Sequence, residues 1–96
     1  MNFGQAIEAL KEGKRVAREG WNGKEMFIYL NYGSKETPVN EGELIDGIKS
    51  NLFFQGDKDT VTRLPNINMK SASGSIATGW LAYQTDMLSE DWVIID

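Results

Sequence analysis

The chain has 96 residues, which is enough for one domain with one hydrophobic core, so we expect no second catalytic or regulatory domain. Its formal net charge of −4 disfavours a long nucleic acid as partner, because such binding depends on cations that neutralise many phosphates. It contains no cysteine and no histidine, which excludes thiol nucleophiles, imidazole bases, disulfides and the usual zinc or copper ligands.

The N-terminal segment, residues 2–13, predicts an amphipathic helix. Asn2 followed by Gln5 matches a capping box, and Gly13 supplies a left-handed exit. Apolar residues recur at helical spacing and form one stripe, which must pack on a sheet. The stripe consists of Phe3, Ala6, Ile7 and Leu10.

The rest of the chain predicts mainly strands. Residues 26–30 are strongly β-prone and suit a central strand that is buried on both faces or lies in an interface. The other predicted elements are a short strand at 15–18, a turn-rich stretch at 19–24, a β-hairpin of 65–70 with 76–82, a turn or single helical turn at 84–91, and a last buried strand at 92–95. The fold class is therefore α+β: an N-terminal helix packed on a small, mainly antiparallel β-sheet in a single domain, 1–96.

The middle of the chain, about residues 31–60, reads as a variable insertion. Glycine, proline, asparagine and aspartate punctuate it and weaken any regular element. Four apolar residues within it could line one face of a short helix: Leu44, Ile45, Ile48 and Leu52.

The loop Gly20-Trp21-Asn22-Gly23 is the first candidate site. Trp21 could stand at the mouth of a pocket and stack on a planar base, or it could be a core residue that pins the loop to the sheet. Asn22 could contact a base or ribose through its amide, although Asn-Gly is also ordinary turn chemistry.

Cations near this loop and near the later hairpin are the second candidate feature. They are the only groupings able to neutralise a diphosphate, and neither a GxxxxGK[ST] nor a GxGxxG phosphate loop is present. These cations are Arg15, Arg18, Lys24, Arg63 and Lys70.

Three carboxylates, Asp86, Glu90 and Asp91, could hold a magnesium ion or perform acid–base chemistry if they converge. Their spacing matches no calcium loop, and such residues before short apolar stretches usually cap turns, which favours a structural role. Three large aromatic residues are predicted to lie in the core or in a subunit interface, and an acidic chain with this many aromatics favours self-association. They are Trp80, Tyr83 and Trp92.

Several segments together resemble the phage family of Thoeris anti-defence protein two. They are the helix Asn-Phe-Gly-Gln-Ala-Ile-Glu-Ala-Leu-Lys-Glu-Gly-Lys, Val16-Ala17-Arg18, Gly20-Trp21-Asn22-Gly23-Lys24, Pro65 to Lys70, and the stretch from Trp80 to Trp92. The resemblance covers residues 2–30 and 63–95, and its most specific part is Gln84-Thr85-Asp86-Met87-Leu88 followed by Asp91-Trp92.

The resemblance implies a sponge that captures the cyclic ADP-ribose-type signal of bacterial Thoeris immunity without degrading it. It also implies a homotetramer with ligand pockets between subunits, and cyclic dinucleotides of CBASS immunity as a second ligand class. Three positions depart from the family pattern, so ligand preference stays open between the two classes. Asn66 and Asn68 stand where a histidine and an acid are expected, and Tyr83 stands where a small residue is usual.

Carried over residue by residue, the resemblance implies ligand contacts in three places. The glycine loop contributes Trp21 and Asn22, the hairpin contributes Arg63, Pro65, Met69 and Lys70, and the polar block before the last strand contributes Gln84, Thr85 and Asp86. No metal, cofactor or catalytic residue is expected.

We therefore expect a phage or prophage protein in the cytoplasm of the bacterial host. No apolar run approaches the roughly 20 residues of a membrane helix, and Met1 begins no signal sequence, so no membrane partner is expected. The alternatives are a protein-interaction inhibitor and, less favoured, a metal-dependent phosphodiesterase.

Overall fold

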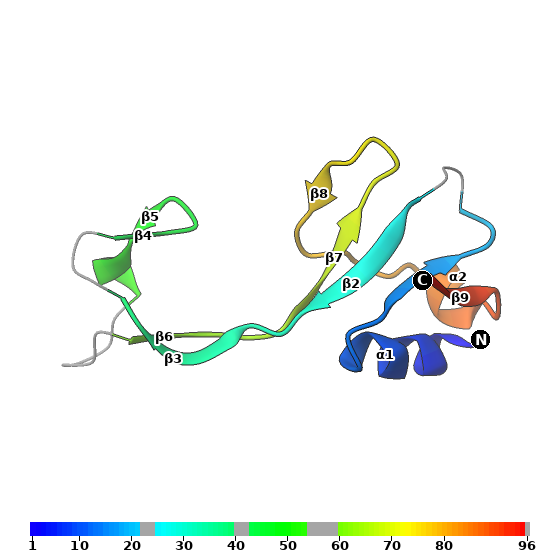
Figure 1. The fold of residues 1–96 in the computed structure, drawn as a ribbon, viewed down its shortest axis with the longest axis horizontal. Helices are drawn as coiled ribbons and strands as arrows, with labels where there is room; N and C mark the ends of the chain where they lie inside the picture. The colour runs from blue at the N-terminus through cyan, green and yellow to red at the C-terminus, as the bar shows by residue number, and fades with distance from the viewer. Residues whose placement is uncertain (22–24, 40–42, 54–59, 96) are drawn as a thin grey trace. The chain divides into compact units, whose positions relative to one another are not determined.

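The computed structural model describes residues 1–21, 25–39, 43–53 and 60–95 (Figure 1). The chain divides into two compact units, and each is described by itself. The first unit comprises Met1–Asn31 and Asn66–Asp96, and the second comprises Tyr32–Pro65. The second unit therefore covers nearly the same residues as the insertion expected from the sequence.

The first unit begins with helix α1 (Phe3–Lys11), and its ends follow the sequence prediction. The Asn2 side chain accepts a hydrogen bond from the Gln5 N–H at 2.8 Å, and the Gln5 side chain accepts one from the Asn2 N–H at 2.9 Å. At the other end Gly13 has a φ of 86°, and the Lys14 N–H donates to the Ala9 carbonyl at 3.1 Å. The helix thus ends in a Schellman motif, which uses a left-handed glycine to satisfy its last carbonyls.

A five-stranded antiparallel sheet completes the first unit, in the order β8-β7-β2-β1-β9. Its strands are β1 (Arg15–Arg18), β2 (Phe27–Asn31), β7 (Asn66–Lys70), β8 (Ile76–Ala77) and β9 (Trp92–Ile95), and the short helix α2 (Gln84–Leu88) precedes β9. Strand β2 is internal, as predicted, because it pairs with β1 on one side and β7 on the other. In the single chain only its residue Ile28 is fully buried, and Phe27 and Tyr29 are half-buried on the opposite face.

The predicted hairpin is confirmed, although its second strand is shorter than residues 76–82. After Ala77 the chain leaves the sheet edge and folds back onto β7. The Gly79 N–H donates to the Asn68 side chain at 2.8 Å, and the Trp80 N–H donates to the Ile67 carbonyl at 2.7 Å. This return places Trp80 against the hydrophobic core.

The core lies between α1 and one face of the sheet. Its buried residues come from α1, β1, β2 and β9, and Phe3, Trp21 and Trp80 pack against them. The buried set is Ala6, Ala9, Leu10, Val16, Ile28 and Trp92. Neither helix among the described residues is long and apolar enough to cross a membrane.

The second unit contains β3 (Ser34–Pro38) paired with β6 (Thr60–Arg63), and β4 (Leu44–Ile45) paired with β5 (Ile48–Lys49). A 3-10 helix, Ser50–Leu52, follows β5. The prediction that Leu44, Ile45, Ile48 and Leu52 line one face of a short helix was wrong, because the first three lie in the β4–β5 hairpin and only Leu52 lies in a helical turn. Asp46 and Gly47 have φ angles of 50° and 83°, so they form the left-handed two-residue turn that closes a hairpin rather than a helical turn.

Candidate functional site

The sheet face opposite α1 carries an aromatic and cationic surface. Because side chains alternate along a strand, and Val16 pairs with Ile28 on the core side, Arg15, Phe27 and Tyr29 lie on the other face. Strand β7 places Lys70 directly opposite Phe27. This face therefore gathers two aromatic rings and two cations.

Three adjacent hollows follow this face, and together they form what we call the sheet groove. The first has a volume of about 280 Å³, with Trp21 and Arg18 in its lining. It shares Glu25 and Ile95 with a second hollow of about 430 Å³. The second hollow shares its cations and Phe27 with a third, of about 380 Å³. The hollows are lined by Arg15, Ala17, Arg18, Glu19, Trp21, Glu25, Met26, Phe27, Tyr29, Lys70, Ile76, Val93 and Ile95.

Two cations meet one aromatic ring in this groove. The guanidinium carbon of Arg15 lies 4.9 Å from the centroid of the Phe27 ring, and Nζ of Lys70 lies 5.5 Å from it. Neither cation forms an ion pair with any carboxylate that the structure describes; Nζ of Lys70 donates a long hydrogen bond to the backbone carbonyl of Glu25 at 3.4 Å. Four other cations do pair with carboxylates: Lys11, Lys14, Arg18 and Arg63. In an acidic chain, two unpaired cations on one apolar surface point to an anionic ligand.

The position of Trp21 agrees with both roles suggested by the sequence, a core residue and a residue at the mouth of a pocket. Its ring packs edge-on against Trp92 at a centroid distance of 5.4 Å and against Trp80 at 6.2 Å, so it belongs to the margin of the core. It is only half-buried, and it also lines the first hollow of the sheet groove. Asn22 lies outside the described residues.

Arg18 connects the end of β1 to helix α2 and to the residue that precedes β9. Its Nη1 lies 2.8 Å from Oδ1 of Asp86, and its Nε lies 2.9 Å from Oδ1 of Asp91. The hydrogen bond from Arg18 holds the pKa of the Asp91 carboxyl below its ordinary value, and the Gly20 N–H, 3.0 Å from Oδ2, adds to this effect. The two carboxylates in turn raise the pKa of Arg18, with the hydrogen bond to Asp91 as the largest cause.

The three residues of the polar block 84–86 lie in helix α2 but differ in burial. Gln84 and Thr85 are exposed, whereas Asp86 is buried with 6% of its surface exposed. Both carboxylate oxygens of Asp86 are occupied, because Oδ2 accepts the Tyr83 N–H at 3.0 Å. Its backbone carbonyl accepts the indole N–H of Trp92 at 2.9 Å. In this chain Asp86 therefore holds α2 against the core.

The predicted hairpin residues fall in different places. Lys70 lines the sheet groove, and Met69 packs against the core from the other face of the same strand. Arg63 and Pro65 belong to the second unit and are exposed. There Nη1 of Arg63 lies 3.7 Å from Oδ1 of Asp46.

The carboxylates of the metal-site alternative do not form a cation site. Asp86 and Asp91 both point at the guanidinium of Arg18, which takes the place that a metal ion would need. Within the described part of the chain, no three carboxylates are grouped to hold a metal.

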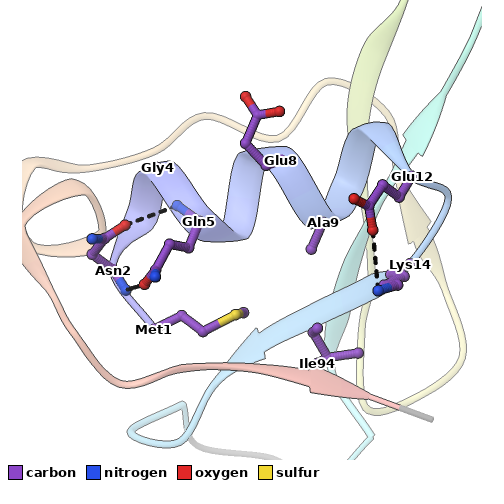
Figure 2. A pocket seen from close by; sticks show the side chains of 9 residues that line it. All are labelled: Met1, Asn2, Gly4, Gln5, Glu8, Ala9, Glu12, Lys14 and Ile94. Carbon is purple, nitrogen blue, oxygen red and sulfur yellow. Dashed lines mark hydrogen bonds and ion pairs between the residues drawn. The ribbon is translucent and has the colours of Figure 1, made fainter.

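Another hollow, of about 430 Å³, lies between α1 and β9 (Figure 2). Most of its polar side chains already have partners: the Asn2 and Gln5 side chains each accept the backbone N–H of the other residue, and Lys14 pairs with Glu12 at 3.1 Å. In Figure 2 the Glu8 carboxylate points away from it. This hollow therefore offers less uncommitted charge than the sheet groove.

Sequence reasoning missed Phe27 and Tyr29 as site residues, and it named Arg15 only as one of several cations. The sequence signal that could have identified Phe27 and Tyr29 was the alternation of side chains between the two faces of β2, because these two aromatic residues flank the core residue Ile28. A run of five apolar residues hides that alternation, because every position favours burial.

Comparison with known proteins adds two findings. A family model described as Thoeris anti-defense 2-like domain matches residues 1–95. A protein of Bacillus phage SP01 named Thoeris anti-defense 2 is 35% identical over 99 residues, which covers 99% of this chain and 94% of the phage protein.

Proposed function

Because this chain belongs to the Thoeris anti-defense 2 family and thus has a phage anti-Thoeris function, we propose that it works by sequestration. It binds the cyclic nucleotide signal of Thoeris, glycocyclic ADP-ribose, and withholds it from the effector without breaking a bond. It does so in the cytoplasm of the infected or lysogenic host.

The single observation that carries this proposal is the sheet groove. Trp21 stands at one end, and the pair Arg15 and Lys70 flanks Phe27 at the other. A nucleotide presents a planar base and negatively charged phosphates, which match an aromatic ring and unpaired cations respectively. The groove thus offers both kinds of contact within one chain.

Capture without turnover agrees with the chemistry of the side chains. The sequence has no histidine or cysteine, and the clustered carboxylates Asp86 and Asp91 both form ion pairs with Arg18. A general base must be free to accept a proton from the reacting group, and these carboxylates already accept hydrogen bonds from Arg18. This argues against the phosphodiesterase alternative.

A sponge has to compete with an effector, and nanomolar capture corresponds to about −12 kcal/mol of binding free energy. Such affinity requires a preformed pocket with walls on most sides. The sheet groove is a surface feature of one chain, so we propose that a homotetramer completes it. The predicted contacts Asn22, Arg63, Pro65, Met69, Gln84, Thr85 and Asp86 remain predictions for that assembly.

The test is to titrate the purified protein with glycocyclic ADP-ribose in a calorimeter, heat the complex, and analyse the released nucleotide by mass spectrometry. Tight binding with intact ligand is expected. Arg15→Gln should weaken binding, whereas Lys49→Gln, which removes an exposed lysine of the second unit, serves as the matched control. Cleaved ligand would make the protein an enzyme.

Two other functions are outcomes of the same experiment. Binding of a cyclic dinucleotide in place of glycocyclic ADP-ribose would assign the protein to the CBASS signals. If neither nucleotide binds while the protein still blocks Thoeris, it acts as a protein-interaction inhibitor, and the exposed aromatic and apolar residues become the candidate contacts.

A further inference from the structure

We infer that the sheet groove is electrostatically polarised, so that it orients a ligand with its phosphate at the Arg15–Lys70 end and its planar ring at the Trp21 end. This inference rests on the proposed capture of a nucleotide and adds the direction in which the nucleotide lies. It also defines the preferred ligand class: molecules that carry their negative charge away from an exposed ring face.

The cationic end is defined by Arg15, Phe27 and Lys70. Both cations lie within cation–π distance of the same ring, and neither has a carboxylate partner among the described residues. The third hollow, at this end, also contains Tyr29 and Ile76. A phosphate placed here meets two positive charges above an apolar floor, which strengthens the attraction by reducing competition from water.

The Trp21 end has the opposite charge. Its cation, Arg18, already faces two carboxylates, Asp86 and Asp91, so this cluster has a formal charge of −1. Of the carboxylate-bearing residues in the groove, Glu19 lines only the first hollow, whereas Glu25 lines the first hollow and also the second, beside the two cations. A phosphate is repelled at this end, whereas an uncharged base can stack on the half-buried indole and accept or donate hydrogen bonds.

The separation of the two ends is on the scale of one nucleotide unit of such a ligand. Arg15 begins β1 and Arg18 ends it, so three residues of extended chain separate them by about 10 Å along the strand at roughly 3.3 Å per residue; their side chains leave the strand on opposite faces, and Arg18 reaches only the margin of the first hollow. This is close to the Debye length of about 8 to 10 Å at physiological salt. The two ends therefore keep distinct potentials instead of averaging into one field.

Two simple probes separate the ends: inorganic pyrophosphate, which has charge and no ring, and adenosine, which has a ring and no charge. Each is titrated into the isotopically labelled protein and followed by NMR. Pyrophosphate should shift resonances of Arg15, Phe27 and Lys70, and adenosine should shift the Trp21 indole. Their binding sites should not overlap.

Single substitutions then test the two ends of the groove separately, because each should weaken the binding of only one probe. Arg15→Gln should weaken pyrophosphate about two- to fivefold, the range of an exposed ion pair, and leave adenosine unchanged. Trp21→Leu should weaken adenosine by at least about fivefold, as expected for a lost stacking contact, and leave pyrophosphate unchanged. Glu25→Gln removes a negative charge shared by two of the hollows, so it should strengthen pyrophosphate binding. Lys49→Gln should change neither.

Several results would overturn the polarity. They are an absence of resonance shifts with pyrophosphate, pyrophosphate-induced shifts centred on Trp21, or an equal loss of affinity for both probes in Arg15→Gln or in Trp21→Leu. Should Trp21→Leu disturb the fold, the Arg15→Gln and Glu25→Gln results still decide the question. Two further outcomes distinguish the polarity from the proposed function. If glycocyclic ADP-ribose does not bind but the two probes still bind at different ends, the proposed function fails and the polarity stands. If glycocyclic ADP-ribose binds tightly but the two probes share one binding site, only the polarity is rejected.

Discussion

Nε of Arg18 lies 2.9 Å from Oδ1 of Asp91, and this ion pair joins two residues 73 positions apart in the sequence. The same guanidinium binds Asp86 in α2, and the second oxygen of Asp91 accepts the N–H of Gly20. The side chains of Arg18 and Asp91 together therefore connect the end of β1, the short helix α2 and Gly20, the residue next to Trp21. Stability and the position of the groove's aromatic end depend on the same contacts.

The first prediction concerns pH. The pKa of Asp91 is held below its ordinary value of 3.8 in the folded protein, so its stabilising effect is fully present above that value. It is lost as the pH falls toward the lower, folded-state pKa. The free energy of unfolding, measured by denaturant titration between about pH 5 and about pH 2, should therefore decrease more steeply in the natural protein than in Asp91→Asn. Parallel curves would show that the pair does not stabilise the fold.

The second prediction concerns Asp86. Replacing it by alanine leaves the Tyr83 N–H without its acceptor and removes one of the two anions that face Arg18. Loss of these charge-assisted bonds from a buried position should lower the free energy of unfolding by about 2 to 3 kcal/mol. Glu90→Ala is the control, because Glu90 is an exposed carboxylate four positions further on, and it should cost less than about 0.5 kcal/mol.

Much of the first unit could be predicted from the sequence because local signals there agree with the tertiary contacts. The Asn2–Gln5 cap, Gly13 and the apolar stripe of α1 all specify the observed helix. The β-branched and aromatic runs likewise predicted β2 and β9 as strands, although β9 lies at the edge of the sheet with Ile94 exposed and is not the fully buried strand expected. Here each residue's intrinsic preference and its place in the core point the same way.

The second unit could not be predicted, because its apolar spacing is ambiguous. Leu44, Ile45 and Ile48 fit one helical face, yet the Asp46–Gly47 pair adopts left-handed angles that reverse the chain. Strand β3 contains two charged residues, only one strand-favouring residue, Thr37, and a terminal Pro38, so its composition does not predict a strand, and it forms by pairing with β6. Pairing between distant segments has no local signature.

The candidate site was predicted only in part, for a related reason. Trp21 and Lys70 were named, but their convergence with Arg15 and Phe27 depends on the register between β1, β2 and β7. Register follows from which residues pair across strands, and a single sequence does not state it. Asp86, in contrast, was weighed as a turn cap, and its bond from the Tyr83 N–H is of that kind.

The third prediction concerns the second unit. Gly33 has a φ of 74°, and a Cβ added there would lie 2.1 Å from the backbone oxygen of Arg63. Gly74 also has a positive φ, 96°, but a Cβ there would meet nothing within 4 Å. Gly74→Ala should therefore cost about 1 kcal/mol from backbone strain alone, and Gly33→Ala should cost more because β3 and β6 must separate. Amide exchange in β6 would accelerate only in Gly33→Ala; equal protection in both variants would contradict this.

The fourth prediction separates the two roles of Trp21. Its ring contacts Trp92 and Trp80, so Trp21→Ala should lower the free energy of unfolding by roughly 2 to 4 kcal/mol, since a half-buried aromatic costs less than a fully buried one. Trp21→Phe keeps an aromatic ring at the core margin and should recover most of this loss, while its smaller face stacks less strongly on a base. Denaturant titration measures the first effect and ligand calorimetry the second. If Trp21→Phe restores stability and full ligand affinity together, the larger indole face is not needed for binding; if it restores stability alone, Trp21 contacts the ligand directly.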